Sequence, residues 1–175
     1  MPIFLYKEDA MQHVQTRSTT SALVLTAVLI ALATLFTMYT KIPVPGIRGY
    51  FNVGDVVIMT SALLLGRKYG AYIGAIGPAL ADLFLGYAVF VPITFVVKGI
   101  EGYLVGTVYN NKTTTSALAA TIVGGIVIVA GYFIAEYFVF DPGVAIASIL
   151  TNTIQAVMSV IVSMILYAIL RKRLG

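Results

Sequence analysis

Charged and carboxamide side chains occur within otherwise apolar segments of this 175-residue chain. They are Asp82, Lys98, Glu101, Glu136, Asn152 and Gln155. A charge in hydrocarbon is energetically costly, so an ionisable residue inside a membrane span is by default a candidate functional residue. With a helical rise of about 1.5 Å per residue, all of them fall in one half of the predicted spans or near the midplane. Side chains of these types can hydrogen-bond the hydroxyl groups and ring nitrogens of a small molecule.

Aromatic residues are concentrated in the same half of the predicted spans. They are Tyr39, Tyr50, Phe51, Phe84, Tyr87, Phe90, Tyr132, Phe133 and Tyr137. An apolar wall with a few polar groups is typical of small-ligand sites, although Tyr87 and Phe90 fit an interfacial aromatic belt equally well. The predicted substrate-binding residues are Tyr50, Asn52, Asp82, Tyr87, Lys98, Glu101, Tyr132, Glu136, Asn152 and Gln155. Because the polar residues stop halfway across the membrane, the pattern favours a binding site over a pore.

Structural roles remain open for several of these charges. Lys98 and Glu101 are three residues apart on one helix and can neutralise each other. Asp82 and Glu136 are alternative partners for Lys98 across the bundle. Asp55 is predicted to be the N-cap of a short helix, where its side chain would accept backbone N–H bonds.

Composition assigns the chain to the membrane and excludes several classes of site. Hydrophobic residues make up 59% of the chain and charged residues 10%, whereas soluble domains are about 25% charged. The chain has no cysteine and one histidine, His13, in a polar N-terminal segment, which argues against thiolate or histidine metal sites. The net charge of +4 is scattered between apolar segments, so no nucleic-acid partner is expected. No GxxxxGK[ST] loop is present, so energy for uphill transport would have to come from another subunit.

The fold class predicted is an all-α integral membrane protein with a bundle of six transmembrane helices. At about 20 residues per span, the chain has room for six helices and short loops. The predicted spans cover residues 21–40, 55–65, 71–85, 90–109, 116–140 and 144–170. A single membrane domain (21–171) thus lies between two polar tails (1–20 and 172–175), with a loop rich in proline and glycine at 41–54.

Basic residues predict the orientation of the bundle. One set of loops and termini carries Arg17, Arg67, Lys68, Lys112 and the terminal Arg171–Arg173 segment, whereas the other set carries Lys41 and Arg48. The positive-inside rule places the richer set in the cytoplasm, together with both termini. The loop 41–54 and the polar half of the bundle then face outward.

Small residues on the first span carry a second signal. Ala27 and Ala31 form a small-xxx-small pair, which lets transmembrane helices approach closely. Internal packing and contact with another subunit both fit this pair.

The segment FNVGDVVIMTSALLLGRKYGAYIGAIGPALADLFLGYAVFVPITFVVKGIEGYLVG (51–106) resembles the S components of energy-coupling factor (ECF) vitamin transporters. The features that carry the resemblance are N-x-G-D, the glycine-rich run ending in A-L-A-D, then G-Y, P-x-T and K-G-x-E-G. Their order and spacing are similar to those of the riboflavin-type and hydroxymethylpyrimidine-type members. Residues 116–170 resemble the family only in being apolar.

The resemblance implies a binding subunit of a prokaryotic plasma-membrane importer, not an enzyme. An S component binds a vitamin from outside and docks on a transmembrane scaffold, the T component, which couples it to two cytoplasmic ATPases. Transferred to this chain, the loop 41–54 is a lid over the vitamin, and Ala27 and Ala31 lie on the docking face. The chain itself needs no cofactor, because ATP and magnesium would be held by the partner subunits.

The residue types available in the predicted site favour some vitamins over others as the substrate. The absence of tryptophan argues against thiamine, which members of this family tend to stack on that residue, and cobalamin is too large for so few polar groups. Pyridoxine or hydroxymethylpyrimidine is favoured, and riboflavin comes next. Two other classes stay open: a stand-alone proton-coupled carrier that uses Asp82 or Glu136, and an assembly subunit without a ligand.

Overall fold

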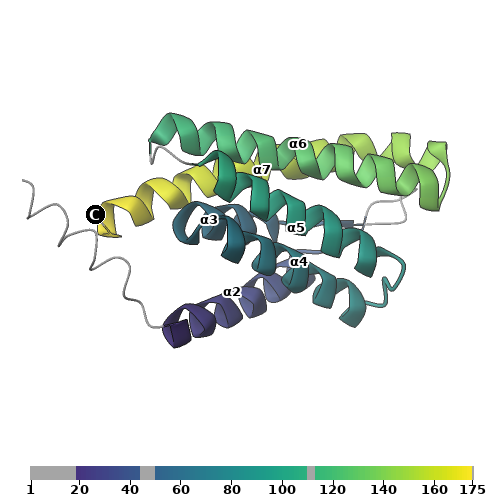
Figure 1. Ribbon diagram of the computed structural model, residues 1–175. Coiled ribbons are helices and arrows are strands. Elements are labelled where there is room, and N and C mark those ends of the chain that lie inside the picture. Colours follow the sequence, from purple (N-terminus) through teal and green to yellow (C-terminus); the bar gives the residue numbers. More distant parts are fainter. Residues whose placement is uncertain (1–18, 44–49, 110–112, 175) are drawn as a thin grey trace, which may run out of the picture.

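The computed structural model describes residues 19–43, 50–109 and 113–174, which form six α-helices (Figure 1). The helices are α2 (Thr19–Tyr39), α3 (Asp55–Leu65), α4 (Arg67–Phe84), α5 (Phe90–Val108), α6 (Thr114–Val139) and α7 (Pro142–Leu174). The predicted all-α class and helix order are confirmed. The predicted 41–54 loop contains a two-residue antiparallel pairing of β1 (Ile42–Pro43) with β2 (Tyr50–Phe51).

The six helices differ in whether they are long enough to cross a membrane. In the described part of the chain, α2, α5, α6 and α7 are long and apolar enough to cross a membrane. In contrast, α3 has 11 residues, which corresponds to roughly 17 Å, or about half of a 30 Å hydrocarbon core. If α3 ends near the membrane surface at Gly66, where φ is +87°, its first residue lies near the midplane. After Gly66, α4 begins at Arg67, four residues before the predicted start of that span.

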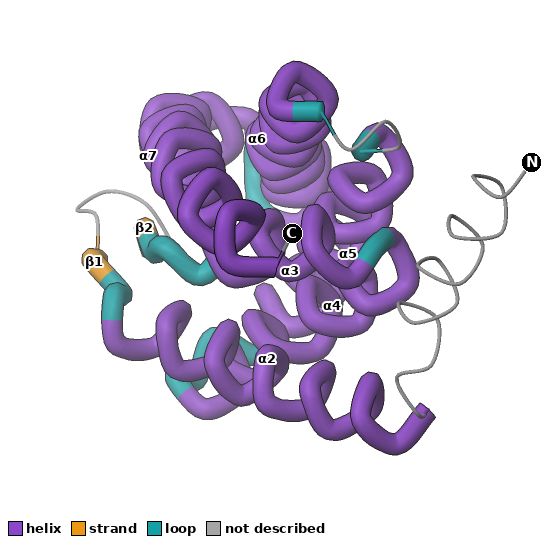
Figure 2. Tube along the Cα trace, turned by 90° about the vertical axis from the view of Figure 1, so that its left-hand side faces the viewer, coloured by secondary structure: helices purple, strands orange, loops and turns teal. Residues whose placement is uncertain are grey.

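The short helix α3 is at the centre of the bundle. It packs against α4, α5 and α7, and its residues from Asp55 to Leu63 are all buried. Figure 2 views the bundle along its helices and shows α3 surrounded by the longer ones. A side chain that projects from the start of α3 therefore meets protein instead of lipid or water.

Glycines bring α4 and α5 into backbone contact beside α3. A Cβ atom added at Gly74 would overlap the carbonyl oxygen of Lys98, and one added at Gly102 would overlap the carbonyl oxygen of Gly70. Small residues of this kind allow close packing of transmembrane helices. This packing fixes the position of Lys98, which is 1% exposed.

The segment before α3 descends into the bundle without helical hydrogen bonds. Side chains satisfy its backbone instead: Val53 N–H donates to Thr40 Oγ1 (3.0 Å), and Gly54 N–H donates to Asn52 Oδ1 (2.8 Å). Asn52 N–H donates to Gln155 Oε1 on α7 (3.0 Å). Irregular backbone at membrane depth is tolerated where protein groups satisfy it in this way.

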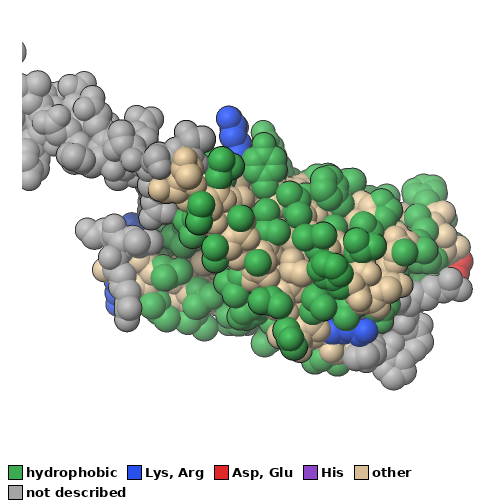
Figure 3. Space-filling model, turned by 90° about the horizontal axis from the view of Figure 1, so that it is seen from below, with side chains coloured by type: hydrophobic (Ala, Val, Ile, Leu, Met, Phe, Trp, Pro, Cys, Tyr) green, Lys and Arg blue, Asp and Glu red, His purple; other side chains and the backbone are tan. Residues whose placement is uncertain are grey.

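The outer surface of the bundle fits a lipid environment. The face in Figure 3 is mostly hydrophobic, with charged side chains near its two ends. Many large apolar side chains are exposed on the helices, including Leu23, Val28, Phe95 and Ile126. Both ends of the described chain lie at the same end of the bundle in Figure 1. Which end faces the cytoplasm stays a prediction from the distribution of basic residues.

Candidate substrate site

A buried ion pair joins α3 to α5 at the base of the polar half of the bundle. Lys98 Nζ contacts Asp55 Oδ1, and Glu101 Oε2 lies 3.8 Å from the same Nζ atom. Gln155 Nε2 on α7 donates a hydrogen bond to Asp55 Oδ2 (2.7 Å). Asp55, Lys98 and Glu101 are at most 1% exposed. One carboxylate thereby ties three helices together and neutralises the lysine.

Two sequence predictions about this cluster were wrong. Asp55 is not the N-cap of α3: that position is Gly54, and no side chain caps the helix there. The ion-pair partner of Lys98 is Asp55, not Asp82 or Glu136. Both errors have the same physical cause, because α3 starts inside the bundle, where a carboxylate needs a charged partner more than a backbone one. The predicted proximity of Lys98 and Glu101 is confirmed.

A small polar cavity of ≈ 40 Å³ lies next to this ion pair. Its walls come from five helices, α2, α4, α5, α6 and α7, and from Asn52 in the segment that precedes α3. The lining residues are Thr37, Asn52, Pro78, Asp82, Phe90, Thr94, Lys98, Tyr132, Glu136, Ser148, Thr151, Asn152 and Gln155. The structure thus gathers around one cavity most of the residues predicted from sequence: Asn52, Asp82, Lys98, Tyr132, Glu136, Asn152 and Gln155. That they bind a substrate stays a prediction.

Of the other three predicted site residues, two do not line the cavity, and the side chain of the third lies outside the described part of the structure. Glu101 is fully buried but lines no wall of the cavity, and it lies near Gly124 of α6. Tyr87, in the turn before α5, packs edge-on against Phe90 and holds Lys41 Nζ 4.8 Å from its ring centroid. Tyr50 lies in β2, and its side chain is outside the described part of the structure.

Hydroxyl-bearing residues of the cavity were missed by sequence reasoning. Ser148, Thr151, Asn152 and Gln155 occur at i, i+3, i+4 and i+7 of α7 and therefore share one helix face. That polar stripe is a readable signal. Thr37 and Thr94 have no such pattern around them, and single threonines are common in membrane helices, so sequence alone could not mark them.

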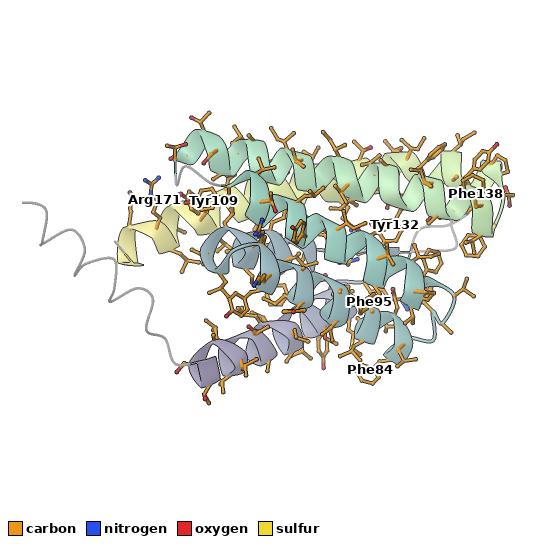
Figure 4. All side chains as sticks on the ribbon, in the orientation of Figure 1. Phe84, Phe95, Tyr109, Tyr132, Phe138 and Arg171 are labelled. Atoms are coloured by element: carbon orange, nitrogen blue, oxygen red, sulfur yellow. The ribbon has the colours of Figure 1, made fainter. Side chains whose placement is uncertain are left out.

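The predicted aromatic cluster divides into two groups. Phe90 and Tyr132 line the cavity, and Figure 4 shows Tyr132 between α5 and α6. Tyr39, Phe84 and Tyr137 are 84%, 66% and 44% exposed, so the expectation that they wall a pocket is wrong. They fit the aromatic belt of a membrane interface.

The cavity's polar groups are unevenly satisfied. Ser148 Oγ hydrogen-bonds Glu136 Oε2, and the hydroxyls of Thr94 and Tyr132 lie 2.9 Å apart. The Tyr132 ring centroid is 5.5 Å from Lys98 Nζ, close enough for a cation–π contact. The buried Thr37 hydroxyl makes no hydrogen bond to any residue that the structure describes. Small-molecule pockets usually measure about 300–1,000 Å³, so a ligand requires the surrounding groups to move apart.

Away from the cavity and the ion pair, the buried polar side chains of the described residues are uncharged hydroxyl groups, such as those of Thr121 and Ser159. Beyond the ion pair, Met59, Val105 and Ile128 belong to an apolar core without a charged side chain. A larger groove of ≈ 570 Å³ runs between α6 and α7, lined by aliphatic and aromatic residues and by Thr153. The groove lacks the converging polar groups that orient a small ligand, so the smaller cavity is the better candidate site.

Comparisons with known proteins point to one family. A family model described as the S component of an ECF-type riboflavin transporter matches residues 17–172. An uncharacterized protein of Pyrococcus woesei is 41% identical over 145 residues, which cover 81% of this chain and 96% of that protein. The thiamine precursor transporter HmpT of Lactococcus lactis subsp. cremoris (strain MG1363) is 28% identical over 93% of this chain and 92% of its own length.

Two solved structures share the fold. The S component of a bacterial ECF transporter matches with a TM-score of 0.74 and 21% identity, over 90% of this chain and 99% of the other. The S component for biotin from an ECF-type ABC transporter matches with a TM-score of 0.62 and 18% identity, over 86% of this chain and 93% of the other. At these identities the two structures support the fold alone.

Proposed function

This chain belongs to the family of ECF-type riboflavin transporter S components, and we propose that it captures hydroxymethylpyrimidine or a closely related single-ring vitamin precursor for an ATP-driven importer. Membership makes it a membrane transport protein for a vitamin-type substrate, not an enzyme. The identity of the ligand and the ATP-driven complex are the parts that we propose.

One observation carries the proposal: a polar cavity gathers carboxylate, amide and hydroxyl side chains from five helices. Aromatic and apolar walls are provided by Phe90, Tyr132 and Pro78. Flat faces for a ring and convergent polar groups for its substituents suit a small heteroaromatic alcohol. Beyond the ion pair, Met59, Val105 and Ile128 pack in an apolar cluster, which favours a binding subunit over a channel.

Hydroxymethylpyrimidine is favoured over the other vitamins by size and by relationship. The cavity is small, so a single ring requires less rearrangement than the three fused rings of riboflavin. A relative that aligns with 93% of the chain transports a thiamine precursor. Pyridoxine, also a single ring, is the second candidate because it too carries a hydroxymethyl substituent on a nitrogen heterocycle.

The proposed partners are a transmembrane scaffold subunit and two cytoplasmic ATPases that bind ATP and magnesium. Ala27 and Ala31 are exposed on α2 and are not buried against other helices of the bundle, which supports a docking role for this face. We place both termini in the cytoplasm, with the loop 41–54 outside. Support for this orientation comes from the basic residues Arg67, Lys68, Arg171 and Lys172 near the ends of α4 and α7.

A retention experiment tests the proposed ligand. Membranes that contain the protein are incubated with equal concentrations of hydroxymethylpyrimidine, pyridoxine, riboflavin and thiamine, and the molecules kept by the purified protein are quantified by mass spectrometry. We expect hydroxymethylpyrimidine to be retained in stoichiometric amount. Preferential retention of riboflavin or thiamine, or of none of the four, would overturn the proposed ligand.

A further inference from the structure

We infer that Glu136 is the residue that selects the ligand, and that it selects a nitrogen heterocycle carrying an amino group beside a ring nitrogen. This inference deepens the proposed function and rests on it. Glu136 lies on α6, about one turn before the helix ends at Val139, and its side chain lines the cavity. It is 3% exposed, so its charge is almost completely removed from solvent.

The lysine in the cavity wall is already neutralised. Lys98 contacts Asp55 and lies 3.8 Å from Glu101, and these are the ion pairs found among the described residues. Two carboxylates thus surround one ammonium group, and Asp55 is further held by Gln155. Lys98 therefore has little capacity left for an anionic or acceptor group of a ligand.

Glu136, by contrast, keeps most of its acceptor capacity. A carboxylate has about four lone-pair positions, and a serine hydroxyl has a single proton to donate. Among the residues that the structure describes, Ser148 is the side chain that hydrogen-bonds Glu136, and its hydroxyl also lies 3.0 Å from the carbonyl oxygen of Ala145. A buried carboxylate with one shared hydrogen-bond donor carries an uncompensated desolvation cost. A ligand that supplies N–H groups offsets this cost by donating further hydrogen bonds to it.

The chemistry of the ligand follows from this demand. An aminopyrimidine has an amine hydrogen next to a ring nitrogen, and when that nitrogen is protonated the two N–H groups form a fork that matches both carboxylate oxygens. The Asn152 amide lines the same cavity and makes no hydrogen bond to a described residue, so it is available for a hydroxyl group. Pyridoxine has no such pair of N–H groups. The N–H of the riboflavin ring is flanked by two carbonyl oxygens, which repel a carboxylate.

The decisive test changes one group on the ligand, from amino to oxo, and one group on the protein, from carboxylate to amide. The probes are 4-amino-5-hydroxymethyl-2-methylpyrimidine and its 4-oxo analogue, titrated calorimetrically into the purified wild-type protein and the Glu136→Gln variant. We expect the wild type to prefer the amino compound by about tenfold to hundredfold. A glutamine amide presents one acceptor and one donor, which matches the C=O and N–H of the oxo compound, so Glu136→Gln should lose or reverse the preference.

Controls separate the possible failures. Asp141→Asn makes the same carboxyl-to-amide change in the turn before α7, outside the cavity, and should keep the wild-type preference because asparagine also caps a helix. If wild type and Glu136→Gln discriminate equally, the inference is wrong while the proposed ligand stands. If the wild type binds neither pyrimidine, the proposed ligand fails as well. Should Glu136→Gln not fold, a wild-type preference for the oxo compound would still overturn the inference, and a preference for the amino compound would support it.

Discussion

Replacing Lys98 by methionine is expected to reduce the free energy of unfolding by about 3–5 kcal/mol, because it leaves the Asp55 carboxylate buried without its cation. The methionine side chain is similar in length to lysine, so the loss reports the charge and not a cavity. The double variant Lys98→Met/Asp55→Asn removes the charges of the closer ion pair and keeps an acceptor for Gln155, while Glu101 stays buried without its cation. It should recover part of the lost stability.

Thermal unfolding in detergent, followed by circular dichroism, measures this effect. The matched control is Lys68→Met, since Lys68 is exposed near the start of α4 and its loss should change stability by less than about 0.5 kcal/mol. Equal instability of the single and the double variant would contradict the account of the ion pair. Lys98 would then act through some contact other than Asp55.

Substituting leucine for Ala27 or Ala31 is expected to abolish assembly with the scaffold subunit while leaving ligand binding intact. Both alanines are exposed on α2, so a larger side chain does not disturb the interior of the bundle. It does prevent another helix from approaching closely at this face. The expected effect is close to all-or-none, because assembly depends on the approach of two helix backbones.

Co-purification of the scaffold and ATPase subunits with the tagged protein measures assembly. Ala119→Leu is the matched control, since Ala119 is an exposed alanine on α6, away from the proposed docking face. Complexes that form normally with both α2 variants would contradict this assignment. A complex lost only with Ala119→Leu would move the docking face to α6.

The helical architecture could be read from sequence because its causes are local. Long apolar segments and breaks at Gly66, Gly86 and Asp141–Gly143 determine where helices begin and end, and the predicted range 55–65 is the range of α3. Helical rise also converts sequence position into distance along a span, which is how the polar residues were placed in one half of the bundle. That reasoning correctly grouped Lys98, Glu136, Asn152 and Gln155.

What sequence could not supply is which residues on different helices meet. Asp55 was predicted to be a helix N-cap, and only the half-length of α3 puts it against Lys98. Glu101 and Tyr87 do not line the cavity, although each contacts a residue that does. Rotation and partner choice are tertiary properties, and depth alone does not determine them.

Uptake by reconstituted vesicles tests the central claim, that the chain is a binding subunit that depends on partners for transport. One set of vesicles contains the protein alone, and the other contains it together with the scaffold and both ATPases. Labelled hydroxymethylpyrimidine is added outside, with or without ATP on the side of the membrane that corresponds to the cytoplasm. We expect accumulation only in the complete complex with ATP. Accumulation by the chain alone, driven by a proton gradient without ATP, would contradict it and identify a stand-alone carrier.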